Sequence, residues 1–262
     1  LSIEKMDFNP EENISISGQA IKEGGKNSNG FIEISIIGGD QSKIEKSATI
    51  NNGAFNTFIT IPKGIKSGLY SLEIYAYEKD FRDEITNKGN FFKSIRLNQI
   101  PRSVDLVFEN KSIEPGKSVK IKPIIYDQTG EKIFSVVSLT IKNSKNKIID
   151  QQEVQSDKSF ELPIKYNEQP SSWKVFAVSG EINSEATFDI LEKESVDVKI
   201  INQTIVITNK GNVPYKKTVL VKIGDEPMNI EADLDVDETK KYVLSAPNGN
   251  YKIEILAGET SE

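Results

Sequence analysis

The sequence predicts an all-β protein: three tandem antiparallel β-sandwich domains of the immunoglobulin-like type in an extended row, the third smaller than the others. Three observations lead to this prediction. Short segments alternate apolar and polar residues, which is the period of a half-buried strand. Asn, Gly and Pro turns separate these segments. Finally, an aromatic residue that opens an alternating strand returns three times, at Tyr70, Trp173 and Tyr251.

The first unit, residues 1–99, shows the alternation most clearly. Its runs 14–18, 31–36 and 72–77 each alternate apolar and polar side chains. Asn51-Asn52-Gly53 lies between two such runs and predicts a hairpin turn, because Asn and Gly tolerate positive φ. Strands of this length with turns about every 8–12 residues are typical of antiparallel sandwiches.

The same plan restarts twice, in a second unit at residues 100–191 and a third at residues 192–262. The separation of the three aromatic strand openers fits domains of roughly 80–100 residues, a normal size for an immunoglobulin-like fold. The third unit is shorter, so we expect fewer strands in it. The linkers near 99–102 and 191–194 carry no Gly/Ser tract. Short connections of this kind limit rotation, so we expect a semi-rigid row.

Composition excludes several classes of function. The net charge is −6 with the two signs interspersed, which argues against nucleic acid and against an anionic membrane surface as partners. No apolar run approaches the ~20 residues of a transmembrane helix, so we expect no direct membrane insertion within this chain. The absence of cysteine excludes a disulfide-stapled module.

The absence of histidine limits the available chemistry further. It excludes Ser-His-Asp and Cys-His catalysis, and together with the absence of cysteine it excludes ordinary zinc sites. Carboxylate pairs, Lys, Tyr and oxygen-ligated metals remain, but no spacing points to a catalytic pair. We therefore predict no enzyme activity, no catalytic residue and no cofactor-binding residue, with calcium as the one ion to consider.

The densest acidic cluster predicts where calcium would bind. At strand spacing, Asp233, Asp235 and Asp237 share one face. Three like charges repel one another, and a hard cation such as calcium would stabilise them through oxygen ligands. The alternative is a solvated strand face that leads into a turn and is neutralised by Lys240 and Lys241.

Aromatic residues offer a second kind of site. Trp173, the only tryptophan, is either a sugar-stacking platform or a core residue. Its counterparts Tyr70 and Tyr251 open equivalent strands, which favours the core. Tyr75 and Tyr77 share one strand face, so they either flank a binding surface or form one half-buried side of a sheet.

Three glycosylation sequons begin at Asn13, Asn110 and Asn202, each near the start of one unit. A chain this rich in Asn, Ser and Thr is expected to contain about three by chance, so their number decides nothing. They remain candidates for glycan attachment.

Turn motifs carry a family resemblance. Residues 113–130, with a Pro-Gly turn and an Asp-Gln-Thr-Gly turn between strands, resemble the immunoglobulin-like or macroglobulin-type domains of archaeal and bacterial surface proteins. Residues 207–214 and 244–249 are similar to adhesion-type sandwiches of archaeal secreted proteins, and the motifs 16–18 and 52–55 to the immunoglobulin-like repeats of such ectodomains. The resemblance implies an exposed, anchored protein with a structural or adhesive role and carries over no catalytic residue.

We therefore expect a non-enzymatic structural or adhesive ectodomain of a microbial surface protein, acting as a spacer or interaction scaffold. It would lie outside the cell, anchored by a segment outside this chain. Its partners would be a protein or glycan at the cell surface, and exposed edge strands also offer a route to self-association. The alternatives are a carbohydrate- or peptide-binding module accessory to a larger surface protein, and calcium-dependent adhesion.

Overall fold

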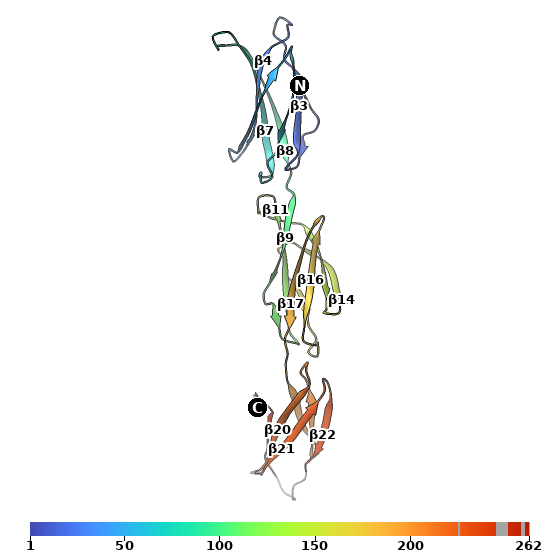
Figure 1. Ribbon diagram of the computed structural model, residues 1–262. Helices are drawn as coiled ribbons and strands as arrows, with labels where there is room; N and C mark the ends of the chain where they lie inside the picture. The colour runs from blue at the N-terminus through green and yellow to red at the C-terminus, as the bar shows by residue number, and fades with distance from the viewer. Residues whose placement is uncertain (225, 245–250, 258–259, 262) are drawn as a thin grey trace. The chain divides into compact units, whose positions relative to one another are not determined.

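The computed structural model describes residues 1–224, 226–244, 251–257 and 260–261, and within them every regular element is a strand (Figure 1). The described residues contain no helix that could span a membrane. The chain forms two compact units, Leu1–Ser103 with Ile125–Ile133 and Val104–Ile124 with Phe134–Glu262. The all-β prediction is confirmed.

The hydrogen-bonded sheets divide the chain more finely than the compact units do. Each sheet stays within one of three stretches, residues 2–97, 101–190 or 196–261, which we call the first, second and third sandwich. The gaps between these stretches lie at residues 98–100 and 191–195, and the domain boundaries near 99 and 191 stay predictions. The count of three independent domains stays a prediction, because the second and third sandwiches belong to one compact unit.

The first sandwich pairs a three-stranded sheet with a five-stranded sheet. The smaller sheet has the order β1 (Ser2–Ile3), β3 (Asn13–Gln19), β6 (Ala54–Thr60). The larger has the order β2 (Asp7–Phe8), β8 (Ile85–Leu97), β7 (Gly68–Lys79), β4 (Gly30–Gly38), β5 (Lys43–Ile50). Strand β2 runs parallel to β8, and the other neighbours are antiparallel.

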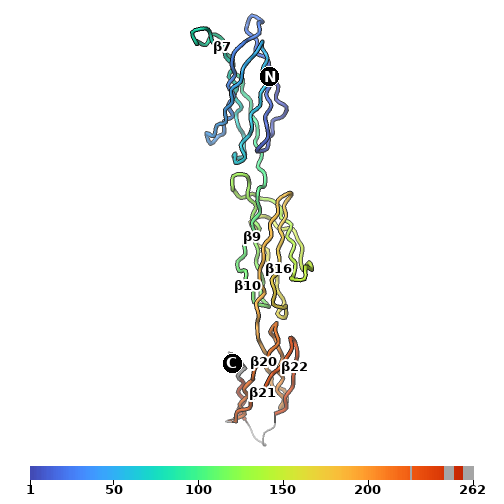
Figure 2. Tube along the Cα trace, viewed as in Figure 1, coloured from blue at the N-terminus to red at the C-terminus, as the bar shows by residue number. Residues whose placement is uncertain are grey.

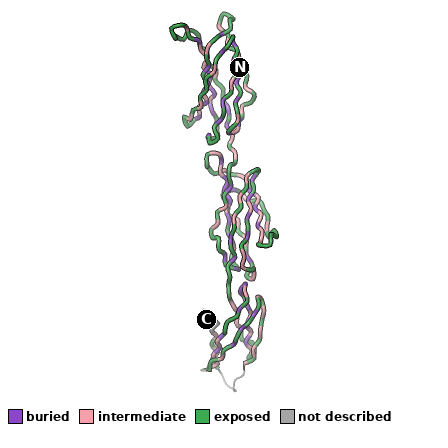
Figure 3. Tube along the Cα trace, in the orientation of Figure 1, coloured by how far each residue is buried: buried purple, intermediate pink, exposed green. Residues whose placement is uncertain are grey.

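The alternation in the sequence is what builds the core of this sandwich. Ile14 and Ile16 of β3 and Ile32, Ile34 and Ile36 of β4 are fully buried, while the residues between them face outward. Figure 3 shows this alternation of buried and exposed residues along the strands. Each buried aliphatic side chain contributes roughly 1.5–3 kcal/mol relative to an exposed one.

The second sandwich, coloured from green to orange in Figure 2, repeats this strand order. Its larger sheet runs β10 (Ser112–Ile113), β17 (Ile182–Ile190), β16 (Ser171–Ser179), β13 (Val136–Lys142), β14 (Ile148–Gln155). Its smaller sheet runs β12 (Lys132–Ile133), β11 (Ser118–Asp127), β15 (Phe160–Pro163), with β9 (Pro101–Phe108) also paired to β11. As in the first sandwich, the short second strand lies parallel to the last one.

The third sandwich has the same order with fewer strands among the described residues. One sheet runs β18 (Val196–Ile201), β19 (Thr204–Asn209), β22 (Thr239–Val243). The other runs β21 (Glu226–Leu234), β20 (Tyr215–Ile223), β23 (Ile253–Ala257), β24 (Thr260–Ser261). The repeated strand-and-turn pattern of the sequence therefore corresponds to a repeated strand order.

The recurring aromatic opener holds in two sandwiches of three. Tyr70 and Trp173 are 5% and 3% exposed, and the Trp173 ring packs 5.8 Å from the ring of Phe188. Tyr251 is 43% exposed because it precedes β23, which begins at Ile253, so the prediction that it packs in the core is wrong. The predicted turn at 249–250, and the rest of residues 245–250, lie outside the described residues.

Candidate ligand-binding face

The first sandwich carries aromatic side chains on the outer side of its larger sheet. The register places Phe31 of β4 opposite Tyr77 of β7, and Tyr75 two residues before Tyr77 on the same side. On the next strand, Phe92 of β8 lies opposite Glu73. Directly paired residues of antiparallel strands point to the same face. We call this surface the aromatic face, made of Phe31, Glu33, Glu73, Tyr75, Tyr77, Asn90 and Phe92.

The rings of the aromatic face form a contiguous group. Those of Tyr75 and Tyr77 lie 5.3 Å apart at an interplanar angle of 30°, and those of Phe31 and Tyr77 lie 5.7 Å apart at 35°. Phe31 is 43% and Phe92 62% exposed, and the two tyrosines are half-buried. Phe31 and Phe92 therefore expose much of their surface to a ligand, and the tyrosines expose part of theirs.

Carboxylates surround the rings. The hydroxyl of Tyr77 donates to Oε1 of Glu33 over 3.0 Å, and this hydrogen bond raises the pKa of the phenol above its ordinary value. The hydroxyl of Ser71 donates to Oε1 of Glu73 over 3.2 Å. Glu45 of β5 lies in the same cross-strand row, opposite Ser35, and pairs with Lys43. Cations lie here too: Nζ of Lys79 is 6.0 Å from the centroid of the Tyr77 ring, and Lys88 lies opposite Tyr77. The surface therefore combines aromatic rings with carboxylates and ammonium groups.

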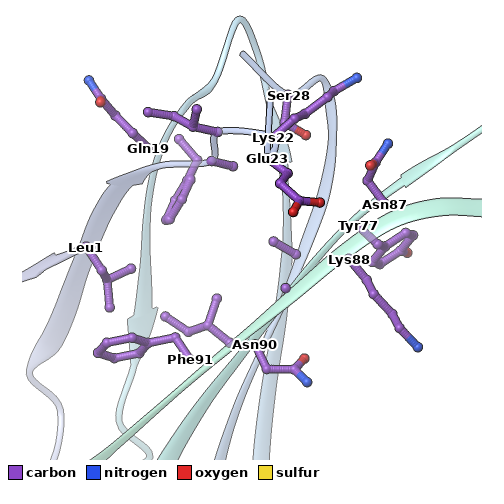
Figure 4. Close-up of a pocket in the computed structure, with 16 residues that line it drawn as sticks. Leu1, Gln19, Lys22, Glu23, Ser28, Tyr77, Asn87, Lys88, Asn90 and Phe91 are labelled. Atoms are coloured by element: carbon purple, nitrogen blue, oxygen red, sulfur yellow. The ribbon is translucent and has the colours of Figure 1, made fainter. Parts of the chain in front are cut away.

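A groove of about 480 Å³ lies between the two sheets on the other side of β8 (Figure 4). Leu1, Phe55 and Phe91 supply apolar lining, and Ile74 and Ala76 of β7 also line it. In Figure 4, Leu1 and Phe91 approach one another, whereas Lys88 and Asn90 project away from them. Tyr77 and Asn90 of the aromatic face also line this groove, so the two surfaces adjoin along β8.

Lys22, which lines the groove, forms an ion pair with Glu78. Glu78 is 7% exposed, and its carboxylate accepts hydrogen bonds from the backbone N of Asn29 over 2.7 Å and from Nδ2 of Asn87 over 2.8 Å. Nζ of Lys22 lies 2.7 Å from its Oε2. These donors, the Lys22 ammonium first, lower the pKa of Glu78 to about 2 against the opposing effect of burial.

The acidic cluster of the third sandwich does not keep the predicted geometry. Strand β21 ends at Leu234, and Asp237 has a positive φ of 64° in the following turn. The prediction that Asp233, Asp235 and Asp237 share a strand face is therefore wrong, because the alternation stops before Asp235. Sequence could not reveal this, since the acidic run has the same spacing whether it forms a strand or a turn.

Each aspartate instead has its own surroundings. Oδ1 of Asp233 lies 3.9 Å from Nζ of Lys216, and the backbone N of Asp235 donates to Oε2 of Glu238 over 2.8 Å. Asp237 accepts from the hydroxyl of Tyr166 and from Nδ2 of Asn167, and these bonds, that of Tyr166 first, lower its pKa. No group of three or more potential metal ligands occurs among the described residues. The calcium assignment stays a prediction, which a calcium titration of the melting temperature would test.

The three sequon asparagines are all exposed. Asn13 opens β3 and accepts from the hydroxyl of Thr60 over 2.6 Å, whereas Asn110 accepts from the backbone N of Ser112 over 3.0 Å. Asn202 lies in the hairpin between β18 and β19 with a φ of 49°. Glycan attachment at these positions stays a prediction.

Sequence reasoning found part of the aromatic face. The prediction that Tyr75 and Tyr77 share a face is confirmed, and both lie on the outer side. Phe31 and Phe92 were missed, because only the pairing of β4, β7 and β8 brings them to the tyrosines. The sugar-stacking interpretation of Trp173 is wrong, since burial leaves its ring no exposed surface for a ligand.

Comparisons with known proteins assign no family to this chain. No model of a known protein family matches the chain, and no curated protein sequence matches it. Similar solved structures include the FN1–FN3 domains of chicken CNTN1, at 11% identity and a TM-score of 0.40, covering 97% of this chain and 89% of that one. An amphioxus IgVJ-C2 molecule is similar at 12% identity and a TM-score of 0.33, over 70% of this chain and 98% of that one.

Bacterial macroglobulin structures are also similar to this chain. The trypsin-activated alpha-2-macroglobulin of Escherichia coli matches at 15% identity and a TM-score of 0.28, over 97% of this chain but only 22% of that one. The chain thus spans about a fifth of that protein. The prediction of antiparallel β-sandwiches agrees with the observed sheets. At such identities none of the three assigns a function.

Proposed function

We propose that this chain is a non-enzymatic interaction module of a microbial cell-surface protein, extracellular and anchored by a segment outside the chain. Its sandwiches serve as a spacer and scaffold. Support comes from the repeated strand order and from a sequence without histidine or cysteine. The observation that carries the proposal is the aromatic face, because partly exposed aromatic rings gathered on one face of a sheet are typical of a binding surface.

The chemistry of the aromatic face favours a neutral carbohydrate. A sugar ring has an apolar C–H face that packs on an aromatic ring, and hydroxyls that donate to carboxylates. Tyr75, Tyr77 and Phe92 supply ring faces, and Glu33 and Glu73 supply acceptors. Carboxylates and ammonium groups balance one another around the rings, so the surface favours neither sign of charge and an uncharged glycan is the occupant to which we commit.

A glycan array with the whole chain tests this function. We expect binding to neutral glycans, and we expect Tyr75→Ala and Phe92→Ala each to weaken it about tenfold, since a ring contact of about 1.4 kcal/mol corresponds to one order of magnitude in Kd. Phe58→Ala is the matched control, because Phe58 is 53% exposed on the other sheet of the same sandwich. Glycan binding that persists in the Tyr75→Ala, Phe92→Ala double variant would refute the proposal, as would the absence of any binding.

A further inference from the structure

Strand β8 has an open edge next to the groove. On one side β8 pairs with β7 along its length, but on the other side β2 covers only Arg96 and Leu97. Among the described residues no other strand pairs with β8. The stretch 87–94 therefore presents an edge without a neighbour, and an open edge is a template for another extended chain.

The hydrogen bonds to β2 show which backbone groups point outward at this edge. The N–H of Arg96 donates to the carbonyl of Met6, and that of Asn98 to the carbonyl of Phe8, each over 2.8 Å. Successive residues of a strand point their N–H and C=O groups to opposite sides. By this alternation the outward groups continue at Ser94, Phe92, Asn90 and Lys88.

The groove supplies space for inward side chains of an added strand. Gly89 lies opposite Ala76, and both line the groove. A Cβ added at Gly89 meets no atom within 4 Å. Leu1, Phe55 and Phe91 then supply apolar walls around this space. Because Gly89 and Ala76 leave this space open and its walls are apolar, the space suits apolar side chains.

Charge favours acidic residues on the outward side of the ligand. Strand β8 carries no acidic residue, and its outer face includes Lys88 and Arg96. Strand β2 already illustrates the preferred chemistry: Asp7 lies opposite Arg96 with Oδ1 3.7 Å from Nε, while the next residue, Phe8, is 2% exposed in the core. An acidic residue outward followed by an apolar residue inward is therefore the pattern that β8 accepts.

We propose that the edge of β8 at residues 87–94, with the groove beside it, binds an extended peptide of another protein as an added strand. The peptide alternates apolar residues, which enter the groove over Gly89, with acidic residues, which face Lys88. Backbone hydrogen bonds to the outward groups give affinity, and the alternation gives specificity. Asn90 and Phe92 also belong to the aromatic face, but the peptide would use their backbone groups, so its binding does not depend on a glycan ligand.

Fluorescence anisotropy with a labelled decapeptide of alternating Asp and Val tests the proposal on the whole chain. A decapeptide of the same composition, with five Asp followed by five Val, is the control ligand. We expect the alternating peptide to bind at least tenfold more tightly. Equal binding of both peptides, or no binding of either at about millimolar concentration, would overturn the proposal.

Two matched variants locate the site. Lys88→Pro removes an outward N–H without touching the ladder to β7, whereas Lys88→Ala removes only the charge. We expect a few-fold loss of peptide affinity for Lys88→Ala and at least a further tenfold loss for Lys88→Pro. Gly89→Val fills the groove and should also cost at least tenfold. Circular dichroism checks that each variant is folded, and peptide affinity that is equal in Lys88→Pro and Lys88→Ala contradicts strand addition.

Hydrogen exchange provides a readout independent of the variants. Bound peptide should slow amide exchange at Asn90 and Phe92, whose N–H groups would become hydrogen-bonded, and leave Phe58 of β6 unchanged. Sedimentation of the chain alone addresses a second copy as the occupant. A dimer that Lys88→Pro dissociates, without peptide binding by the wild type, would replace the peptide with another copy of this chain.

Discussion

Lys22 and Glu78 form an ion pair in which Nζ and Oε2 lie 2.7 Å apart and the glutamate side chain is only 9% exposed. The pair links the loop after β3 to the end of β7, and Asn87 of β8 donates to the same carboxylate. The backbone N of Asn29, just before β4, donates to it as well. The Glu78 carboxylate therefore joins the loop after β3, the start of β4 and β8 to the end of β7.

Replacing this carboxylate should destabilise the first sandwich. Glu78→Gln keeps the size of the side chain but loses its charge and places an amide donor against Asn29 N–H and the Lys22 ammonium. We expect the free energy of unfolding to fall by about 1.5–3 kcal/mol, the range for hydrogen bonds to charged groups. Urea unfolding followed by circular dichroism measures it.

Glu45→Gln is the matched control for that experiment. Glu45 pairs with Lys43, but its side chain is 63% exposed, so its loss should change the free energy of unfolding by no more than about 0.5 kcal/mol. Equal effects of the two substitutions would show that burial of the Glu78 pair has no energetic consequence.

The same carboxylate predicts a dependence of stability on pH. The pKa of Glu78 is lowered from 4.5 to about 2 in the folded chain, so folding favours its charged form. Its contribution is complete above pH ~4.5 and is lost as the pH falls toward 2. Melting temperatures between pH 6 and pH 2 should therefore fall less steeply in Glu78→Gln than in the wild type.

Asp127 explains why some slope should remain in that variant. Burial raises the pKa of Asp127, but hydrogen bonds from Gln99, Thr129 and the backbone N of Glu131 outweigh it and lower the pKa to about 2. Asp127 belongs to the same compact unit as Glu78. A Glu78→Gln variant with the full wild-type slope would assign the acid sensitivity to Asp127 and other carboxylates.

Trp173 should act as a structural residue and as a reporter of folding. It is 3% exposed and packs on Phe188, whose ring also lies 6.2 Å from that of Phe108. Trp173→Ala should lower the free energy of unfolding by about 3–5 kcal/mol, the usual range for deleting a buried aromatic ring. Thermal unfolding measures this loss.

Trp173→Phe provides the comparison. The indole Nε1 is buried and has no hydrogen-bond partner among the described residues, so Phe removes an unsatisfied donor while keeping a ring. We expect it to cost less than half as much as Trp173→Ala. As the sole tryptophan, Trp173 should also show emission that shifts to longer wavelength on unfolding. Emission typical of exposed indole in the native chain would contradict its burial.

The fold was predictable from sequence because strand period and turn chemistry are local. Ile14, Ile16 and Ile32 are buried as the alternation requires, and Asn52 and Gly53 have the positive φ that a hairpin turn needs. The predictions failed where local pattern is ambiguous. The spacing of the acidic residues does not show that β21 ends at Leu234. The aromatic pattern likewise does not show that β23 begins only after Tyr251.

The candidate sites were less predictable because they depend on pairing between distant strands. Tyr75 and Tyr77 share a face by their spacing, but Phe31 joins them only through the β4–β7 register. The open edge at Asn90 exists because β2 is two residues long, and strand length at a chain's outer edge follows from tertiary pairing. Such features require the three-dimensional structure.

Asn212 links the second and third sandwiches within one compact unit, and its removal should destabilise both. It is 2% exposed, its Nδ2 donates to the carbonyls of Glu168 and Leu191 over 2.8 Å each, and its Oδ1 accepts from the backbone N of Lys193 over 2.7 Å. Asn212→Ala leaves these three backbone groups without their partner, at a cost of about 1–3 kcal/mol. Asn212→Asp should cost more, because its carboxylate would face two carbonyl oxygens.

Asn183→Ala, at an exposed position of β17, is the control and should stay within about 0.5 kcal/mol of the wild type. Urea unfolding monitored by Trp173 emission measures all three, and an Asn212→Ala midpoint equal to that of Asn183→Ala would show that this link does not stabilise the unit.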